Sequence, residues 1–180
     1  MRSQIISSSR RRALIALNVL LVLGMLISLY LVYEHFAPAA SKFCQFGASF
    51  DCGVVSKSPY ANLDGISYLL TMDYGLSLPL IDISSRNMVL DFLTTNAFLG
   101  FLMLLFLLLS INASVRGKSC IGVSPLRLPA LITALFTFSI IYGAYLIYIQ
   151  HSILKTYCIL CLALDAIMLA AAVLWWGIKQ

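Results

Sequence analysis

Four stretches of this 180-residue chain are long and apolar enough to cross a lipid bilayer. A hydrocarbon core of about 30 Å needs about 20 helical residues, and we expect spans near residues 13–33, 92–111, 128–149 and 157–178. The composition agrees, because 61% of the residues are hydrophobic and only 11% are charged. Lipid cannot satisfy backbone amides, so the spans should be helices packed together. We therefore predict an all-α membrane protein, with one four-transmembrane-helix bundle as a single domain over residues 1–180.

Basic residues are distributed unevenly between the two ends of the predicted bundle. Positive residues mark the cytoplasmic side, and the end that carries both termini holds eight of the 12 Lys and Arg residues. Both termini are therefore predicted to be cytoplasmic, and the net charge of +5 reflects topology rather than nucleic-acid binding. The eight residues are Arg2, Arg10, Arg11, Arg12, Arg116, Lys118, Arg127 and Lys179, and the other four are Lys42, Lys57, Arg86 and Lys155.

The first apolar stretch has an alternative interpretation. Arginines, an apolar run and Ala37-Pro38-Ala39 together imitate a cleavable signal peptide. The run is longer than the roughly 7–15 apolar residues of a signal peptide, which favours a retained span. A mature protein that begins at Ala40 would contradict the four-span prediction.

The one long polar connection, roughly residues 34–91, lies on the non-cytoplasmic side in this topology. Pro59 and Gly65 bracket a turn within it. The following residues, 66–72, are too few to span the membrane but apolar enough to lie in its interface, which predicts a short interfacial helix. The rest of the connection is predicted to be irregular.

Four of the five cysteines fall on this outer side. Cys44 and Cys52 lie in the loop, and Cys158 and Cys161 form a C-x-x-C motif where the fourth span begins. Disulfides persist outside the cytoplasm, so both pairs can cycle between dithiol and disulfide. Cys120, alone on the cytoplasmic side, is predicted to be a reduced bystander.

The spacing within each pair indicates what it can do. Cys158 and Cys161 are three positions apart at a helix N-terminus, which favours a thiolate at Cys158 and a reactive bond. Cys44 and Cys52 are eight positions apart, so the loop must fold back to bring their Cα atoms within about 7 Å. Alternatively, a mobile loop carries one of them to Cys158, where thiol–disulfide exchange would pass electrons between the pairs.

Three other interpretations of the cysteines remain at this point. The C-x-x-C residues can be two buried small hydrophobic side chains. Four cysteines also match the ligand count of a zinc site, but thiolate zinc sites usually combine two short-spaced pairs, so no metal is predicted. Finally, the chain can be a non-enzymatic four-span scaffold whose loop is held by a structural disulfide.

The order of these features resembles the vitamin K epoxide reductase family. The resemblance rests on two loop cysteines separated by seven residues, then Ser58, Tyr60 and Gly65, and a C-x-x-C opening the fourth helix. The segments 96–100 and 139–146 also resemble the second and third helices of that family. Together these features cover nearly the whole chain.

The resemblance implies a membrane thiol:quinone oxidoreductase that supports disulfide formation. By position, Cys161 would lie next to the quinone with Cys158 as its partner, and Cys44 and Cys52 would be the shuttle pair. A thioredoxin-like protein on the non-cytoplasmic side would supply electrons, through Cys44. The quinone would be of the menaquinone, ubiquinone or vitamin K type, and animal members regenerate vitamin K from its epoxide. The membrane would be a prokaryotic plasma membrane, or the endoplasmic reticulum in a eukaryote.

Five further residues are predicted to form the quinone pocket. The resemblance implies that the family uses an asparagine at the position of Asn96. We place Asn96 one turn into the second helix, where its amide is predicted to bond a quinone carbonyl. An interhelical hydrogen bond is the alternative. Asp165 stands where animal members have a tyrosine. A carboxyl at that depth is costly, so Asp165 is predicted to donate a proton or bond the second carbonyl, with a structural hydrogen bond as the alternative. Ser58, Tyr60 and Tyr68 are predicted to cap the pocket from the loop.

Overall fold

The four predicted spans are present as helices. The computed structural model describes residues 8–38, 44–46, 49–120 and 122–179, and within them four helices are long and apolar enough to cross a membrane. The chain is therefore an all-α, multi-pass integral membrane protein, as predicted. The helices are α1 (Ser8–Phe36), α5 (Asn96–Val115), α6 (Leu128–Ile149) and α7 (Ile159–Lys179).

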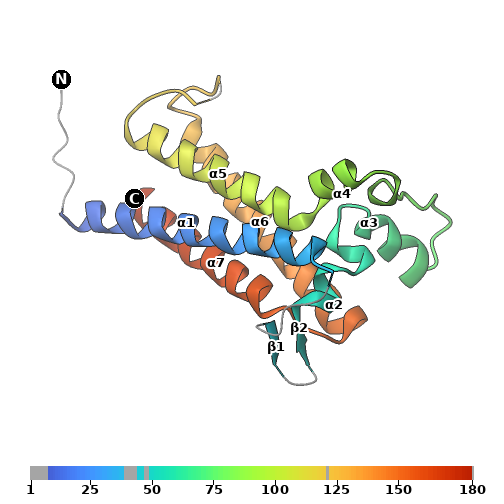
Figure 1. Ribbon diagram of the computed structural model, residues 1–180. Coiled ribbons are helices and arrows are strands. Elements are labelled where there is room, and N and C mark those ends of the chain that lie inside the picture. Colours follow the sequence, from blue (N-terminus) through green and yellow to red (C-terminus); the bar gives the residue numbers. More distant parts are fainter. Residues whose placement is uncertain (1–7, 39–43, 47–48, 121, 180) are drawn as a thin grey trace.

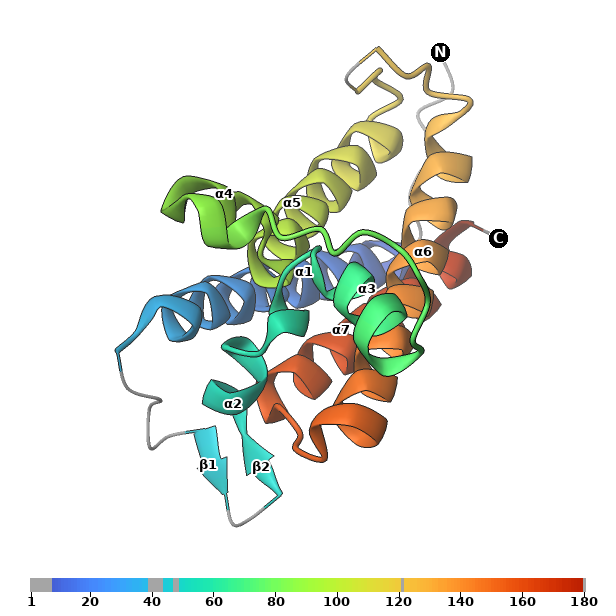
Figure 2. The same cartoon turned by 90° about the vertical axis from the view of Figure 1, so that its right-hand side faces the viewer.

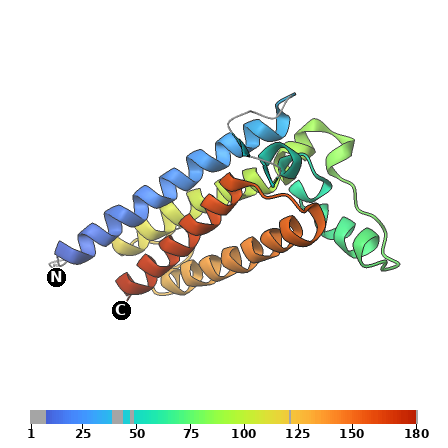
Figure 3. The same ribbon diagram turned by 90° about the horizontal axis from the view of Figure 1, so that it is seen from below.

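The long helices form a bundle, and the labelled elements of the outer loop (α2, α3, α4, β1 and β2) lie at one end of it (Figure 1). Helix α1 packs against α5 and α7, and α6 packs against α7 and α5. Seen from below, the start of α1, the end of α7, the end of α5 and the start of α6 lie at the opposite end (Figure 3). This arrangement agrees with an even number of spans.

The bundle core lies toward the end that carries the termini. All four long helices contribute fully buried apolar side chains to one cluster. Hydrogen bonds between helices supplement this packing, as polar side chains in membrane bundles commonly do: Trp175 Nε1 donates to Thr133 Oγ1 at 3.2 Å, and Asn112 Nδ2 donates to Asn18 Oδ1 at 3.0 Å. Core side chains include Leu17, Leu21, Leu107, Ile111, Leu128, Ile132, Phe136 and Ala171.

The second span begins later than predicted, at Asn96 rather than at residue 92. Thr95 is extended, with φ −61° and ψ 134°, and its Oγ1 accepts a hydrogen bond from the N–H of Phe98 at 3.2 Å. This is the geometry of a helix N-cap. The apolar residues before Thr95 therefore form a separate helix, α4 (Met88–Thr94).

The outer loop holds more regular structure than predicted (Figure 2). The short helix expected over residues 66–72 is present as α3 (Gly65–Tyr68) followed by a π-helical turn, η3 (Leu69–Asp73). A small antiparallel hairpin and several short helices were not predicted. They are β1 (Gln45–Phe46), β2 (Phe50–Asp51), α2 (Cys52–Ser56), η2 (Pro59–Ala61) and η4 (Ser84–Arg86).

Local chemistry explains two of these loop elements. Asp51 caps α2, because its Oδ1 accepts from the N–H of Val54 at 3.1 Å. The predicted turn before α3 needs glycine, since a β-carbon on Gly65 would lie 2.7 Å from Cα of Tyr60. These contacts fold the loop closely over the end of the bundle.

Some sequence expectations concern residues outside the described ranges. Two of the basic residues counted for the topology, Arg2 and Lys42, lie outside these ranges. Ala39 and Ala40, at the alternative cleavage site, lie outside them as well. Helix α1 itself is continuous from Ser8 to Phe36.

Candidate redox site

Main-chain hydrogen bonds join the outer loop to the start of α7. The N–H of Asp51 donates to the carbonyl oxygen of Tyr157 at 3.0 Å, and the N–H of Tyr157 donates to the carbonyl oxygen of Ser49 at 2.9 Å. The two segments run parallel at this bridge. Because Cys52 follows Asp51 and Cys158 follows Tyr157, the bridge sets the two cysteines at neighbouring positions.

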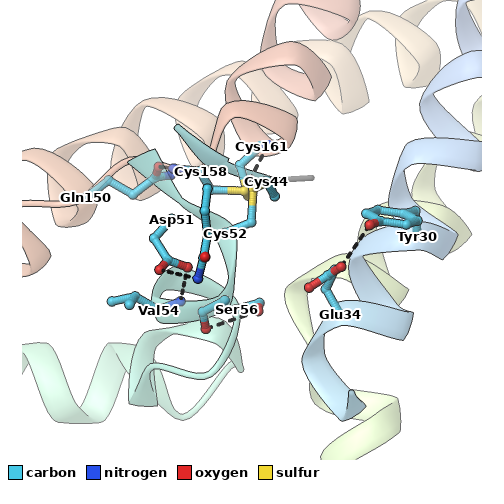
Figure 4. The surroundings of a disulfide bond; sticks show 12 residues. Tyr30, Glu34, Cys44, Asp51, Cys52, Val54, Ser56, Gln150, Cys158 and Cys161 are labelled. Carbon is cyan, nitrogen blue, oxygen red and sulfur yellow. Dashed lines mark hydrogen bonds between the residues drawn. A yellow bond between two sulfur atoms is a disulfide. The ribbon is translucent and has the colours of Figure 1, made fainter. Parts of the chain in front are cut away.

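The four outer cysteines form one buried cluster with Leu31 of α1. Cys44 is joined to Cys52 and Cys158 to Cys161, with Cα–Cα distances of 5.5 and 5.2 Å. Three of the cysteines are at most 1% exposed, whereas Cys161 is half-buried. Figure 4 shows Cys158 beside the loop disulfide. The hairpin supplies the fold-back that the spacing of the loop pair required.

Cys158 lies just before α7, not inside it as predicted. Its carbonyl oxygen accepts from the N–H of Leu162 at 3.0 Å, and its sulfur accepts from the N–H of Cys161 at 3.1 Å. Cys158 therefore caps the helix. A backbone donor and the positive end of the helix both stabilise negative charge on this sulfur, so the expected preference for a thiolate has a geometric basis.

Gln150 also contacts the start of α7, and it was not among the predicted site residues. It is the first residue of a π-helical turn, η5 (Gln150–Leu154), and its Oε1 accepts from the N–H of Cys158 at 2.7 Å. Its side chain is 2% exposed. The predicted third span ended at Ile149, so Gln150 was treated as loop. A polar side chain at the end of an apolar span was the available signal.

Two cavities meet beside the cysteine cluster. The first has a volume of about 100 Å³, and its wall includes Cys161, Gln150 and the loop residues Ser58 and Tyr60. The second has a volume of about 460 Å³ and lies among α5, α6 and α7, with a largely apolar wall. Residues that line both cavities are Asn96, Leu146, Leu164 and Asp165.

Asn96 is the first residue of α5, because Thr95 caps that helix, and so is not one turn into it as predicted. Its Nδ2 donates to the carbonyl oxygen of Tyr60 at 2.9 Å, and its Oδ1 accepts from the hydroxyl of Tyr142 at 2.7 Å. The interhelical hydrogen bond considered as the alternative therefore exists. A primary amide has two N–H donors, so one of them is left for a ligand.

Asp165 lies on α7 against Gly143 of α6. A β-carbon on Gly143 would lie 2.5 Å from Asp165 Oδ1, so the missing side chain makes room for the carboxyl group. In the part of the chain that the structure describes, no hydrogen bond to Asp165 occurs. Its half-buried carboxyl group borders both cavities.

Ser58 and Tyr60 border the first cavity, but their hydroxyl groups are bonded within the loop. Ser58 Oγ donates to the carbonyl oxygen of Val55 at 2.8 Å, and the Tyr60 hydroxyl donates to the carboxylate of Asp73. Burial, followed by this hydrogen bond, raises the pKa of Tyr60. Both residues therefore shape the loop at the cavity wall.

Tyr68, which was predicted to cap the pocket, lies among loop residues. Tyr68 lines neither cavity. Its side chain instead faces carboxylates of the loop, and its pKa is raised by desolvation first and then by Asp82 and Asp64.

His35 fastens the loop to two helices, and it was not among the predicted site residues. Its Nδ1 donates to the carbonyl oxygen of Ser56 at 2.5 Å, and its Nε2 lies 3.1 Å from Asp91 Oδ1. Asn62 Nδ2 donates to the same carboxylate oxygen at 2.7 Å. Through His35, the end of α1 therefore contacts both α2 and α4.

Among the residues described, no cluster of side chains supports metal binding. The four outer cysteines are paired with each other, and no group of three or more His, Cys, Asp or Glu side chains is arranged to hold a metal ion within that part of the chain. The arrangement favours thiol–disulfide chemistry.

Comparison with known proteins agrees with this chemistry. A sequence model of the vitamin K epoxide reductase family matches residues 15–176, while curated protein sequences gave no match. The family, the four spans and the paired cysteines together support an oxidoreductase function in a membrane. Because the match covers nearly the whole described chain, the protein belongs to the vitamin K epoxide reductase family.

Proposed function

We propose that the chain is a membrane thiol:quinone oxidoreductase that supports disulfide formation on the non-cytoplasmic side. One observation carries this proposal: the Asp51–Tyr157 bridge gathers the loop disulfide and the C-x-x-C disulfide in one buried cluster, and Cys161 of that cluster borders a cavity. Thiol–disulfide exchange requires this closeness, because a thiolate must attack a sulfur of the other pair.

The electron route balances as two exchanges and one reduction. A thioredoxin-like dithiol protein reduces the Cys44–Cys52 disulfide and leaves as a disulfide. Cys52 then attacks Cys158, so the Cys44–Cys52 disulfide re-forms and Cys158 and Cys161 become thiols. Oxidation of these thiols to a disulfide releases two electrons and two protons. A bound quinone would be the acceptor for both, becoming a hydroquinone.

The cavities fit a quinone by shape and chemistry. Their combined wall is largely apolar and includes a reactive cysteine, one free amide N–H of Asn96 and the carboxyl group of Asp165. Such a pocket suits an apolar ring with carbonyl oxygens and an isoprenoid tail. The proposed quinone is of the menaquinone, ubiquinone or vitamin K type.

Asp165 is proposed to supply a proton for the reduction. The described chain offers its carboxyl group no hydrogen bond, and the group borders the same cavity as Cys161. A carboxyl group in that setting is stable when it is protonated, which makes it a proton donor. A second role, as a ligand to the other carbonyl, uses the same contact.

The proposed setting is a prokaryotic plasma membrane, or the endoplasmic reticulum in a eukaryote, with both termini cytoplasmic and residues 1–180 forming one domain. The basic residues at the end that carries the termini support this orientation. Lipid surrounds the four spans, and the outer loop would meet the thioredoxin-like partner.

Anaerobic quinone reduction by the purified protein tests the proposal. With a dithiol donor, the wild type should reduce quinone, and Cys161→Ala should lose nearly all turnover. A non-enzymatic scaffold is the competing proposal, favoured only by the loop disulfide Cys44–Cys52. If the wild type neither reduces quinone nor exchanges its Cys158–Cys161 disulfide with a dithiol, the scaffold is correct.

A further inference from the structure

We propose that Gln150 is a quinone-binding residue, whose side-chain Nε2 donates a hydrogen bond to a carbonyl oxygen of a quinone held beside Cys161. This inference rests on the function proposed above. It assigns a ligand role to a residue for which the sequence pattern suggested none, and it places that residue next to the redox pair.

The orientation of the Gln150 amide is fixed by its partner. The N–H of Cys158 can only donate, so the amide atom 2.7 Å from it must be the acceptor oxygen, Oε1. The Nε2 atom, with its two N–H donors, therefore faces away from the Cys158 backbone. Figure 4 shows the Gln150 side chain reaching Cys158 at the edge of the cysteine cluster.

The Nε2 atom has room for a ligand but no hydrogen-bond partner in the part of the chain that the structure describes. Among the described residues, none accepts a hydrogen bond from it. Nε2 has no partner in this part of the chain and yet is not fully enclosed. Among the described residues, the fully enclosed polar atoms without a partner are Ser28 Oγ, Asn62 Oδ1 and Tyr145 Oη. Since the Gln150 side chain is only 2% exposed and borders the cavity of Cys161, the space that Nε2 reaches is this cavity.

The polarity of the two cavities indicates which kind of ligand oxygen accepts from Nε2. A buried donor without a partner is costly, so an acceptor oxygen placed in the cavity gains a hydrogen bond there. The adjoining cavity, which is lined mainly by apolar side chains, favours a ligand that is otherwise apolar. A ring carbonyl on an apolar molecule meets both requirements. Reduction moves negative charge onto that oxygen, so a fixed donor also favours the reaction.

Two substitutions separate this role from support of the helix start. Gln150→Glu keeps an oxygen that accepts from the N–H of Cys158. This N–H and the positive end of α7 favour the ionised carboxylate at pH 8, which has no donor. Gln150→Met removes both the acceptor and the donors. Gln45→Met is a matched control, because Gln45 is exposed and its amide donates to Asp51 Oδ2 outside the cavities.

Binding of a short-chain menaquinone analogue would be measured by fluorescence quenching, and its carbonyl stretch by infrared difference spectroscopy. Gln150→Glu and Gln150→Met should both bind about tenfold more weakly, the loss of about one hydrogen bond. The carbonyl band should move to higher wavenumber in both, while Gln45→Met matches the wild type. Gln45→Met should exchange its Cys158–Cys161 disulfide with a dithiol at the wild-type rate, because Gln45 lines neither cavity.

Two results would overturn the inference in different ways. If Gln150→Glu binds the analogue with wild-type affinity and an unchanged carbonyl band, Gln150 only supports Cys158, and the proposed function stands without it. If the wild type itself neither binds nor reduces the analogue, the proposed function fails and the inference fails with it.

Discussion

The N–H of Asp51 lies 3.0 Å from the carbonyl oxygen of Tyr157, and this contact joins the outer loop to the helix that carries the C-x-x-C motif. The contact is between main-chain atoms, so the pattern of side chains in the sequence does not predict it. Its consequence is that Cys52 and Cys158, separated by two of the four spans and most of the outer loop, occupy neighbouring positions.

This register predicts which loop cysteine exchanges with the C-x-x-C pair. Replacing Cys44 and Cys161 with serine leaves Cys52 and Cys158 without their usual partners. We expect most molecules to form a Cys52–Cys158 disulfide, detected by peptide mapping without reduction.

The matched control replaces Cys52 and Cys161 and leaves Cys44 to pair with Cys158. Its yield of cross-linked protein should be smaller, because the bridge joins the segment that leads directly into Cys52, rather than the one that carries Cys44, to the segment that leads into Cys158. A higher yield for Cys44–Cys158 would show that exchange runs through the other loop cysteine.

Gly143→Ala should disturb the pocket through Asp165. The new β-carbon would lie 2.5 Å from Asp165 Oδ1, so the carboxyl group must move. We expect a loss of about 1–3 kcal/mol of stability in thermal unfolding, as overpacking usually costs, and lower quinone turnover with unchanged dithiol exchange.

A double substitution tests the cause. Gly143→Ala combined with Asp165→Ala should recover stability, because the clash is gone, but not quinone turnover. Gly177→Ala is the control, since a β-carbon there meets no atom within 4 Å. Equal effects of the alanine at both glycines would argue against the contact.

His35→Leu should loosen the outer loop. The substitution removes the hydrogen bond to the Ser56 carbonyl and the contact with Asp91, which should lower stability by about 1–3 kcal/mol. A double-mutant cycle with Asp91→Asn should give a coupling energy of about 0.5–3 kcal/mol, measured by thermal unfolding in detergent. Strict additivity of the two substitutions would mean that the pair contributes nothing.

Tyr60→Phe should lower stability by a similar amount at every pH from 6 to 9. The pKa of Tyr60 is raised above its usual value of 10.0. A raised pKa means that its stabilising effect is fully present below pH 10 and is lost as the pH rises through the folded-state pKa. We expect the hydrogen bond to Asp73 to contribute about 0.5–1.5 kcal/mol.

The difference between wild type and Tyr60→Phe is therefore constant near neutral pH and decreases only in strong alkali. Tyr33→Phe serves as the control, because the Tyr33 side chain is 64% exposed. A difference that decreases between pH 6 and 9 would contradict the assignment of Tyr60 as a protonated donor.

Much of the fold could be predicted because lipid leaves the backbone few choices. The third span was placed at residues 128–149, which are the bounds of α6. The second span was misplaced by four residues because apolar composition continues through Phe92 and Leu93, whereas the helix is interrupted by the Thr95 cap. A capping side chain is a single local signal within a long apolar run, so composition alone misses it.

The site was only partly predictable for a related reason. The positions of the cysteines placed four of them at the same end of the bundle, and the resemblance to the family implied that Cys44 and Cys52 form the shuttle pair. The surroundings of the pairs depend on contacts between distant segments: Gln150 with the Cys158 backbone, Gly143 with Asp165, and Asn96 with Tyr60 and Tyr142. No local pattern in the chain encodes such contacts.

The sequence by itself determined that four helices cross a membrane and that two cysteine pairs lie at the same end, because hydrophobic length and spacing are local properties. Only the tertiary structure decided that Cys52 lies beside Cys158, that Asp165 occupies the space left by Gly143, and that Gln150 borders the cavity of Cys161. The physical reason is that these relationships arise from packing and hydrogen bonds between segments far apart in the chain, which become definite only when the loop folds onto the bundle.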